Sequence, residues 1–258
     1  MTPQPVGLQL REWRQRRRLS QLALASEAEI SARHLSFVET GRASPSREML
    51  LHLTEQLEIP PRERNQLLVA AGFAPIFSER PLADPTLAPA RAAIDLLLQG
   101  QRPFPAFALD RHWNIVASNG ALPQMFEGVE AALLQAPVNA LRLSLHPRGV
   151  APRIVNLAEW RAHLLHRLAQ QIEVTADPVL MELQAEVRAY PGGGGVFTRR
   201  GDAIVVPLQL RIGALELALF STTLVFGTPL DVTLCELAIE SFFPADAATA
   251  ERVRLLAG

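Results

Sequence analysis

The sequence contains no lysine, so arginine supplies all 25 of its basic residues. It has a single cysteine, Cys235, which excludes both an intrachain disulfide and a multi-cysteine zinc site. No apolar run approaches the roughly 18 residues that a membrane span needs. The opening residues, MTPQPVGLQL, lack the charged and then apolar layout of a signal peptide. Together these absences predict a cytoplasmic protein with no membrane partner.

Charge is unevenly distributed along the 258 residues. Residues 1–47 hold eight arginines and four glutamates, a net charge of +4, whereas residues 48–258 have a net charge of −5. A local excess of positive charge favours a polyanionic partner at that end of the chain. The hydrophobic fraction of 48% is enough for one large or two modest domains.

Residues 8–71 have the pattern of five helices separated by short turns. Ser20 and Ser31 each open an amphipathic segment, because a serine oxygen at a helix N-cap accepts free amide hydrogens of the first turn. The apolar residues that follow them at helical spacing are Leu24, Ala28, Leu35 and Val38. Gly41 ends the third helix. The segments SPSREMLLHLTEQLEI and PPRERNQLLVAAG start the fourth and fifth helices.

A proline-rich joint, FAPIFSERPLADPT, separates these helices from a segment that contains short strand-like runs as well as helices. We expect a helix at about 87–99, a hairpin turning at Arg111-His112, two strands joined at Gly213, a strand in LCELAIESFF, and a final helix from Asp246. Residues 119–190 are expected to be mostly helical. Strands, helices and strands again predict one α+β domain with a single antiparallel sheet. The predicted division is a helix-turn-helix domain at 1–74, a linker at 75–86 and a second domain at 87–258.

The second and third predicted helices are joined by only three residues, Ala28, Glu29 and Ile30. Helices joined so closely cross steeply, and the second projects from the surface, which suits the DNA major groove. Residues 6–72 resemble, in register, the helix-turn-helix of the phage-repressor and xenobiotic-response-element family. The matching features are LSQ, LA, Ile30, Leu35, Glu39 and Gly41. Glu29 departs from the family, which usually has glycine there. The alternative to DNA binding is that this segment is a helical bundle that binds protein or only bridges domains.

This resemblance implies a double-stranded DNA operator as partner and a role for each matching residue. Gln21 would bind a phosphate, and Arg42 would touch phosphates on the far side. Ser31, Ala32, Arg33 and Phe37 would face the base edges. Arg33 is the best candidate for reading a base, since its fork matches guanine O6 and N7. A homodimer is expected, because one small reader covers only a few base pairs.

Four further segments resemble a narrower group, the MmyB-like transcription regulators. They are GRASPSREMLLHLTEQLEIPPRERNQLLVAAGFAP, LDRHWNIVASN, HPRGVAPRIVNLAEW and STTLVFGTPLDVTLCELAIESFFPAD. The resemblance implies a second domain with a PAS-like fold, in which helices cover one face of a five-stranded antiparallel sheet. It also implies a pocket between sheet and helices for a small apolar or amphipathic ligand, with a fatty acid expected as effector.

A lipid pocket needs an apolar wall and a polar mouth. The expected wall residues are Phe107, Trp113, Phe126, Trp160 and Leu164, with Phe104, Leu217 and Leu219 as further candidates. The expected mouth residues are His146, Arg153 and Asn156, in the segment HPRGVAPRIVN, and Arg153 is positioned to pair with a carboxylate. The alternative interpretation is that the apolar residues are ordinary core and that Arg153 is a solvated loop residue.

Features typical of enzymes are sparse. His163 and His166 are three apart on a helix, without a nearby third ligand, so we interpret them as surface histidines and predict no metal site. PGGGG lacks the lysine and hydroxyl residue of a phosphate loop, and Cys235 is expected to be a packed thiol in an apolar strand. We therefore predict no catalytic residues, and no cofactor apart from a bound fatty acid. The alternative is an enzyme acting on a lipid-like substrate, with the first domain used for autoregulation.

Overall fold

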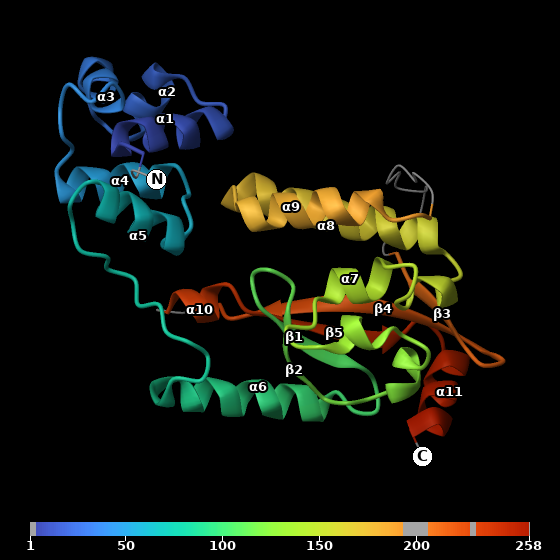
Figure 1. Cartoon of the computed structure of the whole chain (residues 1–258). Coiled ribbons are helices and arrows are strands. Elements are labelled where there is room, and N and C mark those ends of the chain that lie inside the picture. Colours follow the sequence, from blue (N-terminus) through green and yellow to red (C-terminus); the bar gives the residue numbers. More distant parts are fainter. Residues whose placement is uncertain (1–3, 193–205, 228–230, 258) are drawn as a thin grey trace. The chain divides into compact units, whose positions relative to one another are not determined.

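A computed structural model of the chain describes residues 4–192, 206–227 and 231–257 (Figure 1). The chain forms two compact units. One comprises residues 1–79 with 173–176 and 230–232, and the other comprises residues 80–172, 177–229 and 233–258. No helix in the described part of the chain is both long enough and apolar enough to cross a bilayer.

The N-terminal unit contains the five predicted helices. They are α1 (Val6–Arg16), α2 (Gln21–Glu27), α3 (Ala32–Glu39), α4 (Arg47–Gln56) and α5 (Pro61–Ala70). The two predicted serine caps are confirmed: Ser20 Oγ accepts from the Ala23 amide and Ser31 Oγ from the His34 amide, each at 3.0 Å. The apolar stripes meet in one core, in which Leu24, Leu35, Leu50, Leu53 and Leu57 are fully buried.

The turn between α2 and α3 places Glu29 in the left-handed region, with φ +51°. The Ile30 amide bonds back to the Ala25 carbonyl at 2.9 Å, which closes the end of α2. The position where the resembled family usually has glycine is thus occupied here by a glutamate with a positive φ. A non-glycine residue in this conformation costs roughly 1–2 kcal/mol.

Part of the proline-rich joint is fixed to α5. The side-chain oxygen of Asn65 accepts from the amides of Ile76 and Phe77 at 3.0 and 3.1 Å, and its nitrogen donates to the Phe77 carbonyl at 2.8 Å. Arg62 pairs with Glu79. These bonds explain why the N-terminal unit extends to residue 79.

The second unit is built on a five-stranded antiparallel sheet, as predicted. Its strands are β1 (Ala106–Leu109), β2 (Ile115–Ser118), β3 (Leu208–Ile212), β4 (Leu215–Val225) and β5 (Ala238–Pro244), in the order β2-β1-β5-β4-β3. The β3–β4 hairpin turns at Gly213 (φ +56°), and the β1–β2 hairpin turns at residues 110–114, so both predicted turns are confirmed. Residues 203–205, at the start of the strand expected before Gly213, lie outside the described residues.

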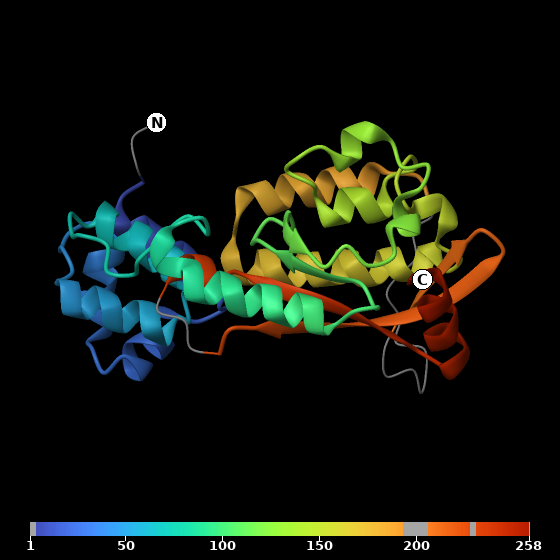
Figure 2. The same cartoon turned by 90° about the horizontal axis from the view of Figure 1, so that it is seen from below.

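Helices cover both faces of this sheet, and not one face only as the resemblance implied (Figures 1 and 2). The helices of this unit are α6 (Ala88–Gly100), α7 (Ala140–Leu145), α8 (Leu157–Thr175), α9 (Pro178–Ala189), α10 (Val232–Cys235) and α11 (Ala247–Ala257). Short 3₁₀ turns add Pro85–Leu87, Pro123–Phe126, Ala131–Leu134 and Ala151–Arg153. Ile94 and Leu98 of α6 pack on one sheet face, and the larger core lies between the opposite face and helices α7, α8 and α9.

The structure corrects the expectation for Cys235. This residue ends the short helix α10 and is half-buried, and β5 begins only at Ala238. The run LCELAIESFF is apolar enough for a strand throughout, but the pattern of apolar residues does not reveal where pairing with β1 and β4 begins. In the structure that pairing starts at Ala238.

Candidate functional site

The exposed side of α3 carries a cluster of two arginines and one aromatic ring. The guanidinium of Arg33 lies 5.4 Å from the centre of the Phe37 ring, and that of Arg42 lies 5.9 Å from the same centre. Both arginines are exposed and Phe37 is half-buried. Stacking on a ring restricts an arginine while its hydrogen-bond donors stay available. The cluster therefore presents two positive charges at a defined position, Arg33 on the predicted recognition helix and Arg42 just beyond its end.

The other predicted DNA contacts have structural partners of their own. Ser31 is exposed but its hydroxyl caps α3, and Ala32 is half-buried in the first turn of that helix. The side-chain amide of Gln21 donates to Glu39 Oε2 at 2.7 Å. This bond orients Gln21 at the start of α2.

The acceptor of that bond belongs to a buried ion pair that the sequence pattern did not reveal. Arg14 of α1 donates from Nε and Nη2 to the two carboxylate oxygens of Glu39 at 2.6 and 2.9 Å, and from Nη1 to the Leu19 carbonyl at 2.7 Å. The pKa of Arg14 is raised, first by its hydrogen bond to Glu39. The pair fixes α1 against α3. The only signal in the sequence was one charged residue within the apolar stripe of each helix.

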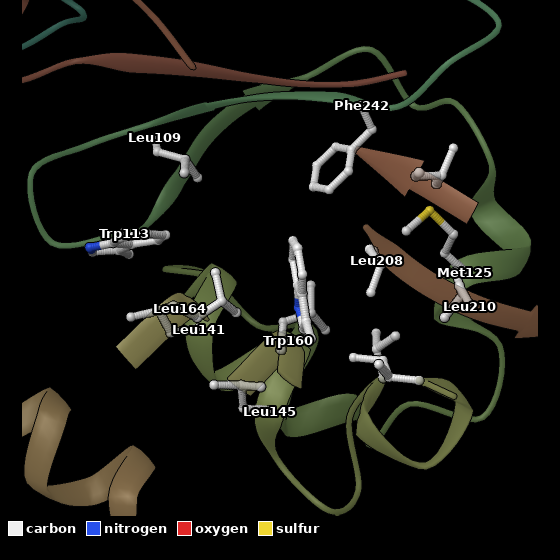
Figure 3. Packing of buried hydrophobic residues seen from close by; sticks show 14 of the residues in the cluster. Leu109, Trp113, Met125, Leu141, Leu145, Trp160, Leu164, Leu208, Leu210 and Phe242 are labelled. Carbon is white, nitrogen blue, oxygen red and sulfur yellow. The ribbon is translucent and has the colours of Figure 1, made fainter. Parts of the chain in front are cut away.

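The second unit contains a partly open apolar cavity of about 80 Å³ between the sheet and its helices. Its wall comes from strands β1, β2, β3 and β5, from helices α7 and α8, from the 3₁₀ turn Pro123–Phe126, and from loop residues. The lining residues are Phe107, Leu109, Trp113, Ile115, Met125, Phe126, Ala140, Leu141, Leu143, Ser144, Val150, Trp160, Leu164, Arg167, Leu208, Glu240 and Phe242. Figure 3 shows Trp160 rising from α8 toward Phe242 of the sheet.

Five of the eight predicted ligand-binding residues line this cavity. They are Phe107, Trp113, Phe126, Trp160 and Leu164. Leu217 and Leu219 are buried in the same core and Phe104 packs against it, but none of these three is part of the cavity wall. Trp113 is held in place unusually firmly, since its backbone has φ +67° and its indole donates to Gln171 Oε1 at 2.8 Å. A strained residue kept by such a bond is typical of binding sites.

The three residues predicted at a polar mouth lie elsewhere and bind the protein's own backbone. Arg153 donates to the carbonyls of Gln124 and Met125, and burial lowers the pKa of its guanidinium. The side chain of Asn156 donates to the Pro207 carbonyl at 2.8 Å and accepts from the Gln209 amide at 3.0 Å, which joins α8 to β3. His146 packs edge-on against Tyr190. None of the three lines the cavity.

The polar groups that do line the cavity were not predicted. Arg167 pairs with Glu240 at 2.7 Å, and Ser144 Oγ accepts from the Trp160 indole at 3.0 Å. Burial raises the pKa of Glu240, but hydrogen bonds from Arg167 and the charge of that guanidinium outweigh it, so the pKa is lowered overall. Glu240 is therefore ionised at neutral pH. Glu240 lies in a strand of alternating pattern, and its partner Arg167 is 73 residues away in the sequence. The sequence therefore gives no indication that the two residues pair.

The two histidines of α8 differ from each other. His166 is exposed, as expected, but His163 is half-buried with its ring 5.5 Å from that of Trp160. Burial lowers the pKa of His163, and the nearby positive charge of Arg167 lowers it further. His163 is thus part of the packing behind the cavity wall. Within the described ranges, no group of three histidine, cysteine or acidic residues is arranged to hold a metal.

Two family models match the chain, one over each unit. The model of a helix-turn-helix domain matches residues 5–67. The model of the MmyB-like transcription regulator ligand binding domain matches residues 90–256, well over half of the chain. The chain belongs to the MmyB-like transcription regulators. No curated protein matches it significantly.

The two matches divide the described features between a helix-turn-helix and a ligand-binding domain. An MmyB-like regulator combines a helix-turn-helix with a ligand-binding domain. The arginine cluster of α3 lies in the part matched by the helix-turn-helix model, and the cavity lies in the part matched by the ligand-binding model. The protein is thus a transcription regulator with a DNA-binding domain and a small-molecule domain.

Proposed function

We propose that this MmyB-like regulator is a one-component sensor that acts as a homodimer. Its cavity binds an amphipathic molecule with a hydrocarbon chain, of the fatty-acid type, and occupancy of the cavity changes operator affinity. The observation that carries the proposal is the apolar cavity walled by Trp113, Trp160 and Phe242 in the same chain as a helix-turn-helix.

The size of the cavity supports a coupling between binding and conformation. Its volume of about 80 Å³ is small compared with the about 300–1,000 Å³ of typical ligand pockets. A long hydrocarbon chain therefore fits only when the wall opens, and a ligand that prefers the open wall shifts the population toward it. The helices of the wall, α7 and α8, are the elements that such a change moves. The ligand can change the equilibrium between the open and closed walls only by the ratio of its affinities for these two states.

The DNA side of the proposal rests on the charge of residues 1–47 and on the cluster of Arg33, Phe37 and Arg42. One helix-turn-helix domain of this size contacts only a few base pairs. Two copies bound to a two-fold symmetric operator therefore supply the required specificity. Operator affinity falls steeply with salt in this proposal, with a log–log slope of about −0.9 for each phosphate neutralised. A flat response would favour the alternative of a protein-binding helical bundle.

The decisive experiment follows ligand and operator together. Fatty acids of increasing length are titrated into lipid-stripped full-length protein, with tryptophan fluorescence reporting binding and fluorescence anisotropy reporting affinity for a selected operator. Each buried CH₂ contributes about 0.8 kcal/mol, so affinity rises with chain length until the cavity is full. Ala140→Leu narrows the cavity and shortens the longest chain accepted. Ala158→Leu, at an exposed position on α8, is the matched control. It changes neither the size of the cavity nor the longest chain accepted.

The possible outcomes separate the parts of the proposal. Binding without dependence on chain length contradicts an apolar tunnel. If binding depends on chain length but operator affinity does not change, the lipid pocket is supported and control of DNA binding by the ligand is contradicted. Conversion of the ligand to a product, seen by mass spectrometry, transfers the assignment to the alternative of a lipid-metabolising enzyme.

A further inference from the structure

The charged groups of the cavity wall form one closed ion pair. Arg167 of α8 donates from Nη1 and Nη2 to the two carboxylate oxygens of Glu240 on β5, at 2.7 and 2.9 Å. The side chain of Glu240 is 6% exposed. Both residues line the cavity among apolar neighbours. The wall therefore carries two opposite charges that cancel each other.

The surroundings hold this pair in a fixed geometry. Thr223 Oγ1 lies 3.0 Å from both Arg167 Nη2 and Glu240 Oε2, and thus joins the network from β4. The guanidinium of Arg167 also stacks 5.0 Å from the centre of the Trp113 ring. A two-point bond between planar groups, supported from two sides, does not open without loss of several contacts. Arg167 is consequently not available as a free cation.

The described part of the cavity wall offers no second cation beside this pair. Among the described residues that line the cavity, Arg167 is the only basic one. Arg153, the cation expected near a carboxylate, does not line the cavity and donates to main-chain carbonyls instead. A carboxylate entering this space loses its hydration, gains no net counter-charge and lies near the ionised Glu240. Each of these effects disfavours the charged form.

An uncharged hydroxyl suits the same wall. The pair offers donors on Arg167 and acceptors on Glu240, and a hydroxyl group both donates and accepts, whereas a carboxylate only accepts. We propose that the cavity selects a neutral hydrocarbon-chain amphiphile, such as a fatty alcohol, over the free carboxylate of the same chain, with its head at the Arg167–Glu240 pair. This inference rests on the proposed function and specifies its ligand class. Glu240 acts as the specificity-determining residue because its charge cancels that of Arg167.

The test compares three ligands with the same chain and different heads. Octan-1-ol, octanoate and octylamine are titrated into full-length protein at about pH 7.5, followed by calorimetry and tryptophan fluorescence. The alcohol binds about tenfold or more tightly than octanoate, because only the carboxylate must be buried as an uncompensated charge. Octanoate affinity rises as the pH falls toward the pKa of the acid, because the neutral acid resembles the alcohol.

Two variants shift the head-group preference in opposite directions. Glu240→Gln leaves Arg167 as a net cation, so octanoate affinity rises about tenfold while octan-1-ol changes little. Arg167→Gln leaves a net anion, so octylamine gains and octanoate does not. Glu216→Gln, in the exposed pair with Arg211 on the β3–β4 hairpin, removes the same charge as Glu240→Gln and alters no affinity. If one cavity variant fails to fold, the other variant and the wild-type comparison still decide.

The results also separate this inference from the proposed function. Equal affinity of wild-type protein for octan-1-ol and octanoate, or an octanoate affinity that Glu240→Gln does not improve, overturns the selection of a neutral head. If such head-independent binding still changes operator affinity, the proposed function stands without this inference. Failure of all three ligands and of longer chains to bind overturns both.

Discussion

Arg33 and Phe37 lie one turn apart on α3, and the guanidinium of the first rests 5.4 Å from the centre of the second's ring. Arg42, from beyond the end of the helix, approaches the same ring at 5.9 Å. The ring thus restricts two long side chains before any DNA is bound. Restriction in the free protein lowers the entropy cost of forming a specific contact. We therefore expect Arg33 to be the main base-contacting residue, with Arg42 beside it.

The first prediction concerns Arg33. Replacement by alanine weakens operator binding by about 1–3 kcal/mol and random DNA much less, because a base contact is lost and not only a charge. Anisotropy titrations with a selected operator and a scrambled duplex measure both. Arg11→Ala, an exposed position on α1, removes the same charge and leaves the ratio of the two affinities unchanged. Equal losses for Arg33→Ala on both duplexes would show a phosphate contact only.

The second prediction concerns the buried pair of Arg14 and Glu39, whose side chains are 9% and 1% exposed. Glu39→Leu leaves a buried guanidinium without its partner and lowers the free energy of unfolding by about 3–5 kcal/mol. The double variant with Arg14→Met recovers most of this loss, since two apolar side chains replace the pair. Chemical denaturation measures each variant. The same double replacement in the exposed pair of Arg211 and Glu216 shifts stability by less than about 1 kcal/mol.

The third prediction concerns the strained turn. Glu29→Gly raises the free energy of unfolding by up to about 1 kcal/mol, because glycine adopts a positive φ without a clash but loses more chain entropy on folding. Glu27→Gly, in the last turn of α2, has the opposite sign, since a helical glycine is destabilising. Thermal denaturation of both variants gives the comparison. A loss of stability in Glu29→Gly would mean that the glutamate side chain contributes more than the strain costs.

The fourth prediction concerns pH. Burial, and then the charges of Arg167 and His166, lower the pKa of His163 below its usual 6.5, while Glu240 acts in the opposite direction. The unfolded chain therefore binds a proton at this residue more readily than the folded chain. The stabilising contribution of His163 is complete above pH 6.5 and is lost as the pH falls through 6.5 toward the folded pKa.

Denaturation between about pH 7.5 and pH 5.5 measures this dependence. The free energy of unfolding of the wild type decreases toward acid, and His163→Gln shows a flatter profile. His166→Gln, at an exposed position of the same helix, keeps the wild-type slope. Identical slopes for all three proteins would exclude His163 as the group that titrates.

The sequence by itself determined the local features of this protein. The serine caps, the five N-terminal helices and the turn at Gly213 depend on neighbouring residues, so their patterns were readable without the fold. Five of the apolar residues that line the cavity were predicted correctly because large side chains on buried faces meet in one core. The α+β sheet followed from the order of strands and helices.

Only the tertiary structure decided which polar groups meet. Arg167 and Glu240 lie 73 residues apart, and Arg14 and Glu39 lie 25 apart. Arg14 and Glu39 left only the weak signal of a charged residue within an apolar stripe, and Arg167 and Glu240 left none. Arg153 shows the converse, because its sequence suggests a ligand anchor while its guanidinium binds the carbonyls of Gln124 and Met125. A buried charge is placed by the partner that compensates it, and that partner is brought near only when the whole chain folds.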